Sequence, residues 1–246
     1  MPVQHAAATE TIRDLAGSVR RHPALENDFY RHWMSGPLPF RQVEVFAREF
    51  YARTIDTTVM IALSVLHTDD LAARAARVKH LYTEYGNGDP DKAHLLLLER
   101  MLTGLLGRLR GGGYSVQELR AGGGRPETRA FGDARRALFT DADPRVVQGA
   151  LLAQDALAHS TTIRMYEGMR NYKHLYDEED FHASCEYFYV HICEAAKSDR
   201  EELVAAAAGV CRDEVDLAQV RRGFDGVLDL TAAYWAAVHR AMRTPA

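Results

Sequence analysis

A helical pattern is interrupted by the sequence Leu81-Tyr-Thr-Glu-Tyr-Gly-Asn-Gly-Asp-Pro-Asp-Lys-Ala-His94. Apolar residues recur at helical spacing on both sides of this segment. Its two glycines are typical of a helix end, and its Asp-Pro pair is typical of the start of the next helix. The segment therefore predicts that Glu84 closes one helix and that His94 opens the next.

Glu84 and His94 are also residue types that bind metal ions, and the turn between them predicts that they lie close together. Two interpretations of the pair remain open on this segment alone. Glu84 could be an ordinary solvated acid at a helix end, and His94, which precedes four leucines, could be a core histidine. Further ligands elsewhere in the chain are needed to favour a metal site.

Helical spacing of apolar residues extends over almost the whole sequence, whereas strand-like alternation of β-branched residues is nearly absent. The pattern predicts an all-α fold. We expect helices over 8–20, 24–35, 40–67, 69–85, 90–108, 126–141, 144–174, 180–197, 200–208 and 213–242.

A chain of 246 residues is long enough for one well-filled core and does not require two domains. We expect a single helical domain. It comprises an N-terminal helix within 1–22, a first half of a bundle over 23–110, a glycine-rich connection over 111–125 and a second half over 126–246.

The charge balance of 30 basic and 34 acidic residues gives a formal net charge of −4. Such a balance does not favour nucleic acid or an anionic membrane surface as a partner. Apolar runs of about 18 residues, as a membrane span needs, are absent from the sequence.

The three cysteines have no zinc-like spacing, and their odd number does not suggest a disulfide framework. The N-terminal stretch has no basic region followed by an apolar core. We therefore expect a protein with reduced thiols in the cytoplasm.

Two predicted helices carry further ligand-type residues. Asp155 and His159 are four residues apart, so they share one helix face, which either meets solvent or points to a site where a buried Asp needs a partner. His191 follows three aromatic residues and precedes Glu194, and alone it could be a core histidine. Carboxylates and imidazoles from facing helices build non-haem iron sites. Such a site could combine these residues with Glu84 and His94.

Four features carry a family resemblance: Gly36-Pro-Leu-Pro-Phe-Arg-Gln42, the segment from Glu84 to His94, Asp155, and Tyr187-Phe-Tyr-Val-His191. Over about residues 23 to 202 the chain resembles the haem-oxygenase-like diiron oxidase superfamily, whose members are described as iron-containing redox enzymes. That superfamily shares its fold with the pyrroloquinoline-quinone synthase and thiaminase II families. The resemblance implies a haem-oxygenase-like multi-helix bundle.

The resemblance also implies a ligand set. Glu84 and His94 match iron ligands of the family, and Asp155 aligns with a ligand Glu on the long helix. The family's final motif is His, Asp four residues on, and His three further on. His191 matches its first member, but Ala195 and Ser198 occupy the other two positions. Asp56, His159 and Glu194 are the residues that could compensate for these two missing ligands.

The activity that the resemblance implies is that of an Fe(II)- and O2-dependent oxidoreductase in the biosynthesis of specialised metabolites. Its substrate would be a small amino-acid-like or fatty-acid-like molecule, whose carboxylate could pair with Arg53, Arg164 or Lys197. Two ligands are missing, so we expect that at most one of the family's two iron ions is firmly held. We also expect a homodimer.

Two alternatives remain. One is a metal-free enzyme of the quinone-synthase and thiaminase branch, in which His, Tyr and acid side chains perform acid–base chemistry. The other is a non-catalytic binding partner.

Overall fold

The computed structural model describes residues 2–66, 71–121, 124–197 and 200–244, which form helices joined by turns, without a strand. The predicted all-α class is therefore confirmed. The α-helices are α1 Pro2–Ser18, α2 Asp28–Met34, α3 Phe40–Thr54, α4 Thr57–Leu66, α5 Leu71–Glu84, α6 His94–Arg110, α7 Val116–Arg120, α8 Pro126–Phe139, α9 Pro144–Met169, α10 Glu178–Ser184, α11 Glu186–Lys197, α12 Arg200–Gly209 and α13 Glu214–Arg243. Short 3-10 turns cover Val19–Arg21, Gly86–Gly88, Pro90–Lys92 and Arg170–Leu175.

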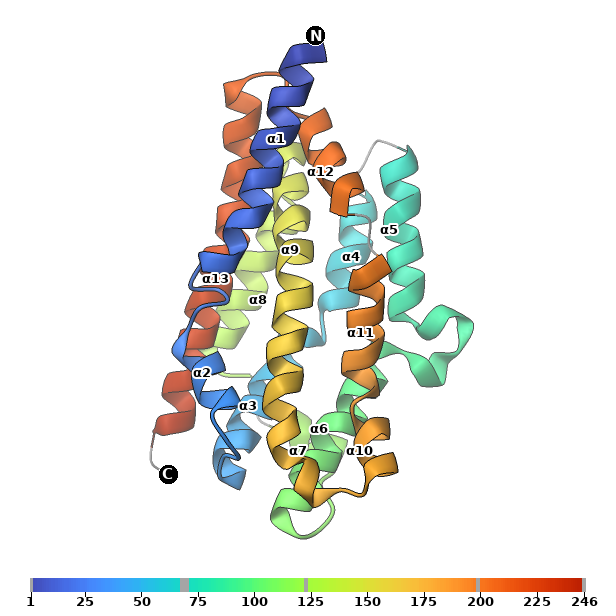
Figure 1. Cartoon of the computed structure of the whole chain (residues 1–246), viewed down its shortest axis with the longest axis vertical. Coiled ribbons are helices and arrows are strands. Elements are labelled where there is room, and N and C mark those ends of the chain that lie inside the picture. Colours follow the sequence, from blue (N-terminus) through green and yellow to red (C-terminus); the bar gives the residue numbers. More distant parts are fainter. Residues whose placement is uncertain (1, 67–70, 122–123, 198–199, 245–246) are drawn as a thin grey trace.

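The helix α9 runs along the middle of the bundle and contacts α13, α11, α2, α12, α8 and α1 (Figure 1). The helices enclose one contiguous hydrophobic core, as a single helical domain requires. The largest fully buried side chains in this core include Trp33, Trp235, Tyr30 and Phe29. None of the helices in the described part of the chain has the length and apolar character needed to cross a bilayer.

Two glycines set the distance between α9 and α13 where these helices cross. A Cβ atom at Gly149 would lie 1.9 Å from the carbonyl oxygen of Val220, and a Cβ atom at Gly223 would lie 2.0 Å from the carbonyl oxygen of Val146. Both separations are far below van der Waals contact, so a side chain at either position would force the helices apart. The reciprocal contact fixes how the two longest helices meet.

Two buried carboxylates fasten other helices to α3. Glu49 on α3 accepts hydrogen bonds from the backbone N–H of Arg125 at 3.0 Å and from the hydroxyl of Thr128, at the start of α8. Glu99 on α6 accepts a hydrogen bond at 2.7 Å from the hydroxyl of Tyr51 on α3. Because these carboxylates have partners, their burial does not leave unsatisfied charges in the core.

Two predicted helices are each divided into two shorter helices in the structure. The predicted helix 40–67 is divided into α3 and α4 after Thr54, and the predicted helix 180–197 is divided into α10 and α11 at Cys185. Neither break contains glycine or proline, so the local sequence carried no signal for it. The glycine-rich connection 111–125 also contains the short helix α7, which a capping box starts.

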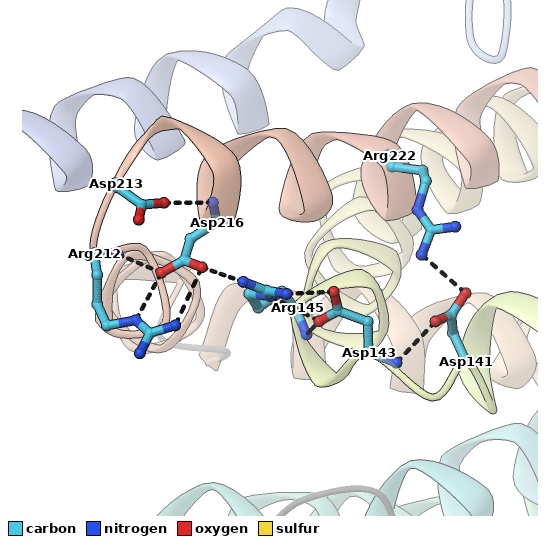
Figure 2. Close-up of polar contacts among 7 residues, drawn as sticks. All are labelled: Asp141, Asp143, Arg145, Arg212, Asp213, Asp216 and Arg222. Carbon is cyan, nitrogen blue, oxygen red and sulfur yellow. Dashed lines mark hydrogen bonds and ion pairs between the residues drawn. The ribbon is translucent and has the colours of Figure 1, made fainter.

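A network of charged side chains joins the turn before α9 to the turn before α13 (Figure 2). Arg145 donates hydrogen bonds to Asp143, with its Nη2 atom 2.7 Å from Oδ2, and also to Asp216. Arg212 donates to Asp216 through its backbone N–H at 2.9 Å and its Nε at 2.8 Å. These hydrogen bonds from Arg212, and those from Arg145, hold the pKa of Asp216 below its usual range.

We predict that Gly223→Ala destabilises the protein by about 3 kcal/mol, because the new methyl group has to push α9 and α13 apart. Guanidinium unfolding measures the effect. Gly132→Ala on α8 is the control, because nothing lies within 4 Å of a Cβ atom there. Its better helix propensity is expected to stabilise the protein by about 0.5–1 kcal/mol. Equal effects of the two substitutions would contradict the close crossing.

We predict that Asp216→Asn lowers the thermal unfolding midpoint at pH 7 and that the difference from the original protein shrinks in acid. The folded-state pKa of Asp216 is lowered, so its stabilisation is complete above the unfolded-state pKa of about 4 and is lost as the pH falls below it. Calorimetry at several pH values checks this. Asp225→Asn is the control, because Asp225 is exposed and forms no ion pair with the described residues. A difference for Asp216→Asn that is independent of pH would contradict the role of the charge.

Candidate metal centre

Three ligand-type side chains from three helices converge on one point. Glu84 is the last residue of α5, His94 is the first residue of α6, and His191 lies in the second turn of α11. One ligand atom from each residue lies within 4.8 Å of those of the other two. Glu84 and His94 are 8% and 4% exposed, and His191 is partly buried. The structure therefore brings together three of the four predicted metal ligands.

The turn between α5 and α6 makes this convergence possible. Gly86 and Gly88 have φ angles of 80° and 96°, and Asn87 between them has a φ angle of 56°. Glycine and asparagine adopt such left-handed backbone more readily than other residues. The prediction that Glu84 ends one helix and His94 begins the next is confirmed.

The predicted start of the second helix at residue 90 is wrong by four residues. Asp89 does accept a hydrogen bond from the backbone N–H of Asp91, but the element that it caps is the 3-10 turn Pro90–Lys92. The α-helix begins only at His94. An Asp-Pro pair starts a helical turn of either kind, so it cannot distinguish between them.

The Glu84 carboxylate contacts a histidine with each of its oxygens. Its Oε2 lies 3.3 Å from Nδ1 of His94, and its Oε1 lies 3.6 Å from Nε2 of His80. Burial opposes the charge on Glu84. The interactions with His80 and His94, and the nearby His191, outweigh burial and lower the pKa of this carboxyl below its usual range. Glu84 is therefore ionised at neutral pH, as a metal ligand has to be.

A backbone contact orients His191. Its Nδ1 lies 2.7 Å from the carbonyl oxygen of Tyr187. A carbonyl oxygen only accepts hydrogen bonds, so Nδ1 carries the proton and the lone pair of the neutral ring is on Nε2. Metal-binding histidines are commonly fixed in this way. The ring centroid of His191 lies 4.5 Å from that of His94.

Aromatic side chains cover one side of the group. Tyr187, which is 8% exposed, packs its ring 4.5 Å from the ring of His191, measured between centroids. The ring of Phe50 on α3 lies nearly perpendicular to that of Tyr187, with 6.4 Å between the ring centroids. Such a cover reduces the access of water and strengthens the electrostatic interactions at the site.

Other predicted site residues lie outside this group. Asp155 and His159 on α9 are both partly buried, and neither belongs to the three-residue group found among the described residues. Asp56 lies 3.6 Å from Arg136, in an ion pair. The metal-binding roles of Asp155, His159 and Asp56 therefore stay predictions.

Two positions of the expected final motif and one compensating residue are only partly described. The backbone of Glu194 and Ala195 belongs to α11, but their side chains lie outside the description, and Ser198 lies outside the described residues altogether. The structure therefore leaves the roles of these three residues as predictions.

His80 was not predicted from the sequence as a site residue. This residue is one helical turn before Glu84 on α5, and the contact between them joins positions i and i+4. The signal was present in the sequence, because His and Glu at this spacing share a helix face. His80 is the most exposed of the three histidines near Glu84, with a side chain that is 51% exposed.

The donor set of the group fits a divalent transition metal. Ligand atoms bound to one ion at about 2.1 Å lie about 3–4 Å from each other, so atoms within 4.8 Å need only a small adjustment. Two imidazoles and one carboxylate, with other positions open, are the ligands of mononuclear non-haem Fe(II) oxygenases. Glu84, His94 and His191 provide these ligands.

Solved structures share this fold. A CADD-like protein of unknown function from Nostoc punctiforme has a TM-score of 0.71 and 15% identity, covering 98% of this chain and 100% of that chain. A TenA homolog from Pseudomonas syringae pv. tomato has a TM-score of 0.71 and 12% identity, covering 94% and 92%. A Shewanella denitrificans domain described as having a heme oxygenase-like fold has a TM-score of 0.66 and 16% identity, covering 94% and 90%. The fold is therefore a heme-oxygenase-like helical bundle.

The sequence itself identifies the family. Residues 44–232 match the family model described as iron-containing redox enzyme, and this match spans most of the chain. The chain belongs to the iron-containing redox enzyme family. No curated protein matches the sequence.

We predict that Gly86→Ala destabilises the protein by about 1–3 kcal/mol, because of its left-handed backbone. A Cβ atom there would also lie 2.9 Å from the backbone carbon of Lys92. Asn87→Gly is the matched control and is expected to change stability little, because glycine adopts the left-handed conformation at least as readily as asparagine. Urea unfolding of both variants checks the prediction. A stable Gly86→Ala variant would show that the turn does not need this conformation.

Proposed function

We propose that Glu84, His94 and His191 bind one Fe(II) ion and that the protein is an O2-dependent oxidoreductase acting on a small organic substrate. The observation that carries the proposal is the convergence of one ionised carboxylate and two imidazoles within 4.8 Å. Membership of the iron-containing redox enzyme family supports it. We propose a single ion because the described residues form one such group of three ligands.

Each residue of the site has a distinct role in this proposal. Glu84 supplies negative charge through Oε2, while His80 interacts with the opposite oxygen and restrains the carboxylate. The carbonyl oxygen of Tyr187 holds His191 in the tautomer with its lone pair on Nε2. Bound iron would supply the one-electron chemistry with dioxygen that these side chains lack. Tyr187 and Phe50 would limit the entry of water beside it.

A metal-free enzyme is the second candidate function. The contact of 3.3 Å between Glu84 and His94 is that of a carboxylate–histidine pair, which can transfer protons without a metal. The similarity in fold to a TenA homolog is compatible with this alternative. Iron binding separates the two candidates.

We predict that anaerobic titration of the metal-free protein with Fe(II) gives one equivalent of tight binding. Glu84→Gln and His94→Ala each remove a ligand and are expected to weaken binding at least about 100-fold. A competing chelator measures the affinity, and paramagnetic resonance after exposure to air detects Fe(III). His174→Ala is the control, because His174 is exposed and its Nδ1 lies beside a backbone carbonyl of its own turn.

Asp155→Asn tests the number of ions. If one ion is bound as proposed, this substitution leaves both stoichiometry and affinity unchanged. Two equivalents that fall to one in Asp155→Asn would replace the single-ion proposal with a two-iron centre. Unchanged iron binding in His94→Ala, or no binding by the original protein, would overturn the iron proposal in favour of the metal-free candidate.

A further inference from the structure

The helix α5 lies at the edge of the bundle and carries a line of exposed apolar side chains. In the described part of the chain it packs mainly on α4 and on the 3-10 turn that follows it (Figure 1). Leu71, Val78 and Tyr82 on α5 are 77%, 51% and 54% exposed, and Tyr85, directly after its last residue, is 56% exposed. Together with the exposed Ala75 they form what we call the α5 seam.

The spacing of the α5 seam is that of a coiled coil. Successive members are separated by four, three, four and three residues. This repeat of 3.5 residues places them at the a and d positions of successive heptads, on one narrow face of the helix. Single exposed apolar side chains are ordinary, whereas a contiguous line of them marks a surface that another chain covers.

The inward face of α5 fixes the orientation of the seam. Arg77 donates hydrogen bonds at 2.6 Å to the carbonyl oxygen of Ser64 on α4 and at 2.8 Å to Oε1 of Gln148 on α9. Glu84 lies two turns further along the same side of the helix and is buried among the candidate metal ligands. Rotating the seam into the core would break the polar contacts of both Arg77 and Glu84, so the seam stays on the outside.

The two tyrosines suit the seam to protein recognition. A tyrosine side chain combines a large apolar ring with a polar hydroxyl, and tyrosine is enriched at protein interfaces. The hydroxyl of Tyr82 lies against Gly88, where an added Cβ atom would be 2.6 Å from it. The seam therefore ends beside the turn that brings Glu84 and His94 together.

Charged residues beside the seam decide which kind of helix it can accept. In the heptad that the seam defines, Arg74 is at position g and Lys79 is at position e. The charged flanking residues are therefore both basic, and the one acidic residue of α5, Glu84, is buried. Charges at e and g select a partner helix of opposite charge. A second copy of α5 would bring basic flanks against each other, which disfavours self-association through this face.

The width of the seam favours a helix over a lipid surface. Amphipathic helices that lie on membranes present a broad apolar face, whereas an apolar stripe confined to positions a and d is typical of helix pairing. Lys79 and His80 follow Val78 directly and are both exposed. The exposed apolar face of α5 is therefore narrow.

We propose that the α5 seam docks an amphipathic helix of a partner protein, with apolar residues at its a and d positions and acidic residues at its e and g positions. Apolar side chains of that helix occupy the space beside the small Ala75, between Leu71 and Val78, and its carboxylates pair with Lys79 and lie near Arg74. Docking of this helix does not depend on iron, so it stands apart from the proposed function.

The test is fluorescence anisotropy of labelled three-heptad peptides that are mixed with the protein at low ionic strength. One peptide has leucine at a and d and glutamate at e and g, a second has lysine in place of each glutamate, and a third keeps the glutamates but has serine at a and d. We expect the first peptide to bind at least about tenfold more tightly than the other two. Equal binding of the acidic and basic peptides, or no binding of the first peptide, would overturn the proposal.

Substitutions locate the bound peptide on the protein. Lys79→Glu is expected to remove most of the preference for the acidic over the basic peptide, and Val78→Ser is expected to weaken binding of the acidic peptide at least about tenfold. Arg221→Glu and Val215→Ser are the matched controls, because both residues are exposed on α13 rather than on α5. Controls that change binding as much as the α5 variants would contradict docking at the seam.

Other occupants of the seam have outcomes of their own. Analytical ultracentrifugation of the protein without peptide detects self-association, and a dimer that Val78→Ser converts to a monomer would replace the partner helix with a second copy of this chain. Binding to phosphatidylglycerol vesicles that is lost in Val78→Ser, with no binding of the acidic peptide, would replace it with a lipid surface. Either result overturns the proposal.

Discussion

The contact between the backbones of α9 and α13 is the constraint on which the rest of the bundle depends. Gly149 and Gly223 each meet a carbonyl oxygen of the opposite helix where any side chain would collide with it. This crossing fixes the longest helices, and α2, α3, α8 and α11 pack against one or both of them. It also fixes where Tyr234 and Trp235 on α13 enter the core, and hence which rings surround Arg53.

The three candidate ligands, in contrast, come from elements outside that crossing. Glu84 and His94 lie at the ends of two helices, where a left-handed turn determines their approach. His191 comes from α11, which contacts both α9 and α6. The ligand group therefore has a local part, set by the turn, and a long-range part, set by the packing of α11.

This division explains how much of the molecule could be predicted from its sequence. Helical periodicity and the Gly-Asn-Gly-Asp-Pro sequence were sufficient for the all-α class and for placing Glu84 and His94 at facing helix ends. They could not show whether Asp155 joins that group, because the rotation of a 26-residue helix depends on its neighbours. The break at Cys185 was equally invisible, since a fully buried cysteine has no turn-forming property.

Charge sets the requirement of the candidate metal centre. An ionised Glu84 lies among histidines that can hold a cation, and Tyr187 and Phe50 cover one side of the group. A buried charge is costly without a partner. A metal ion would stabilise the group, because it supplies the positive charge that the ionised carboxylate of Glu84 needs.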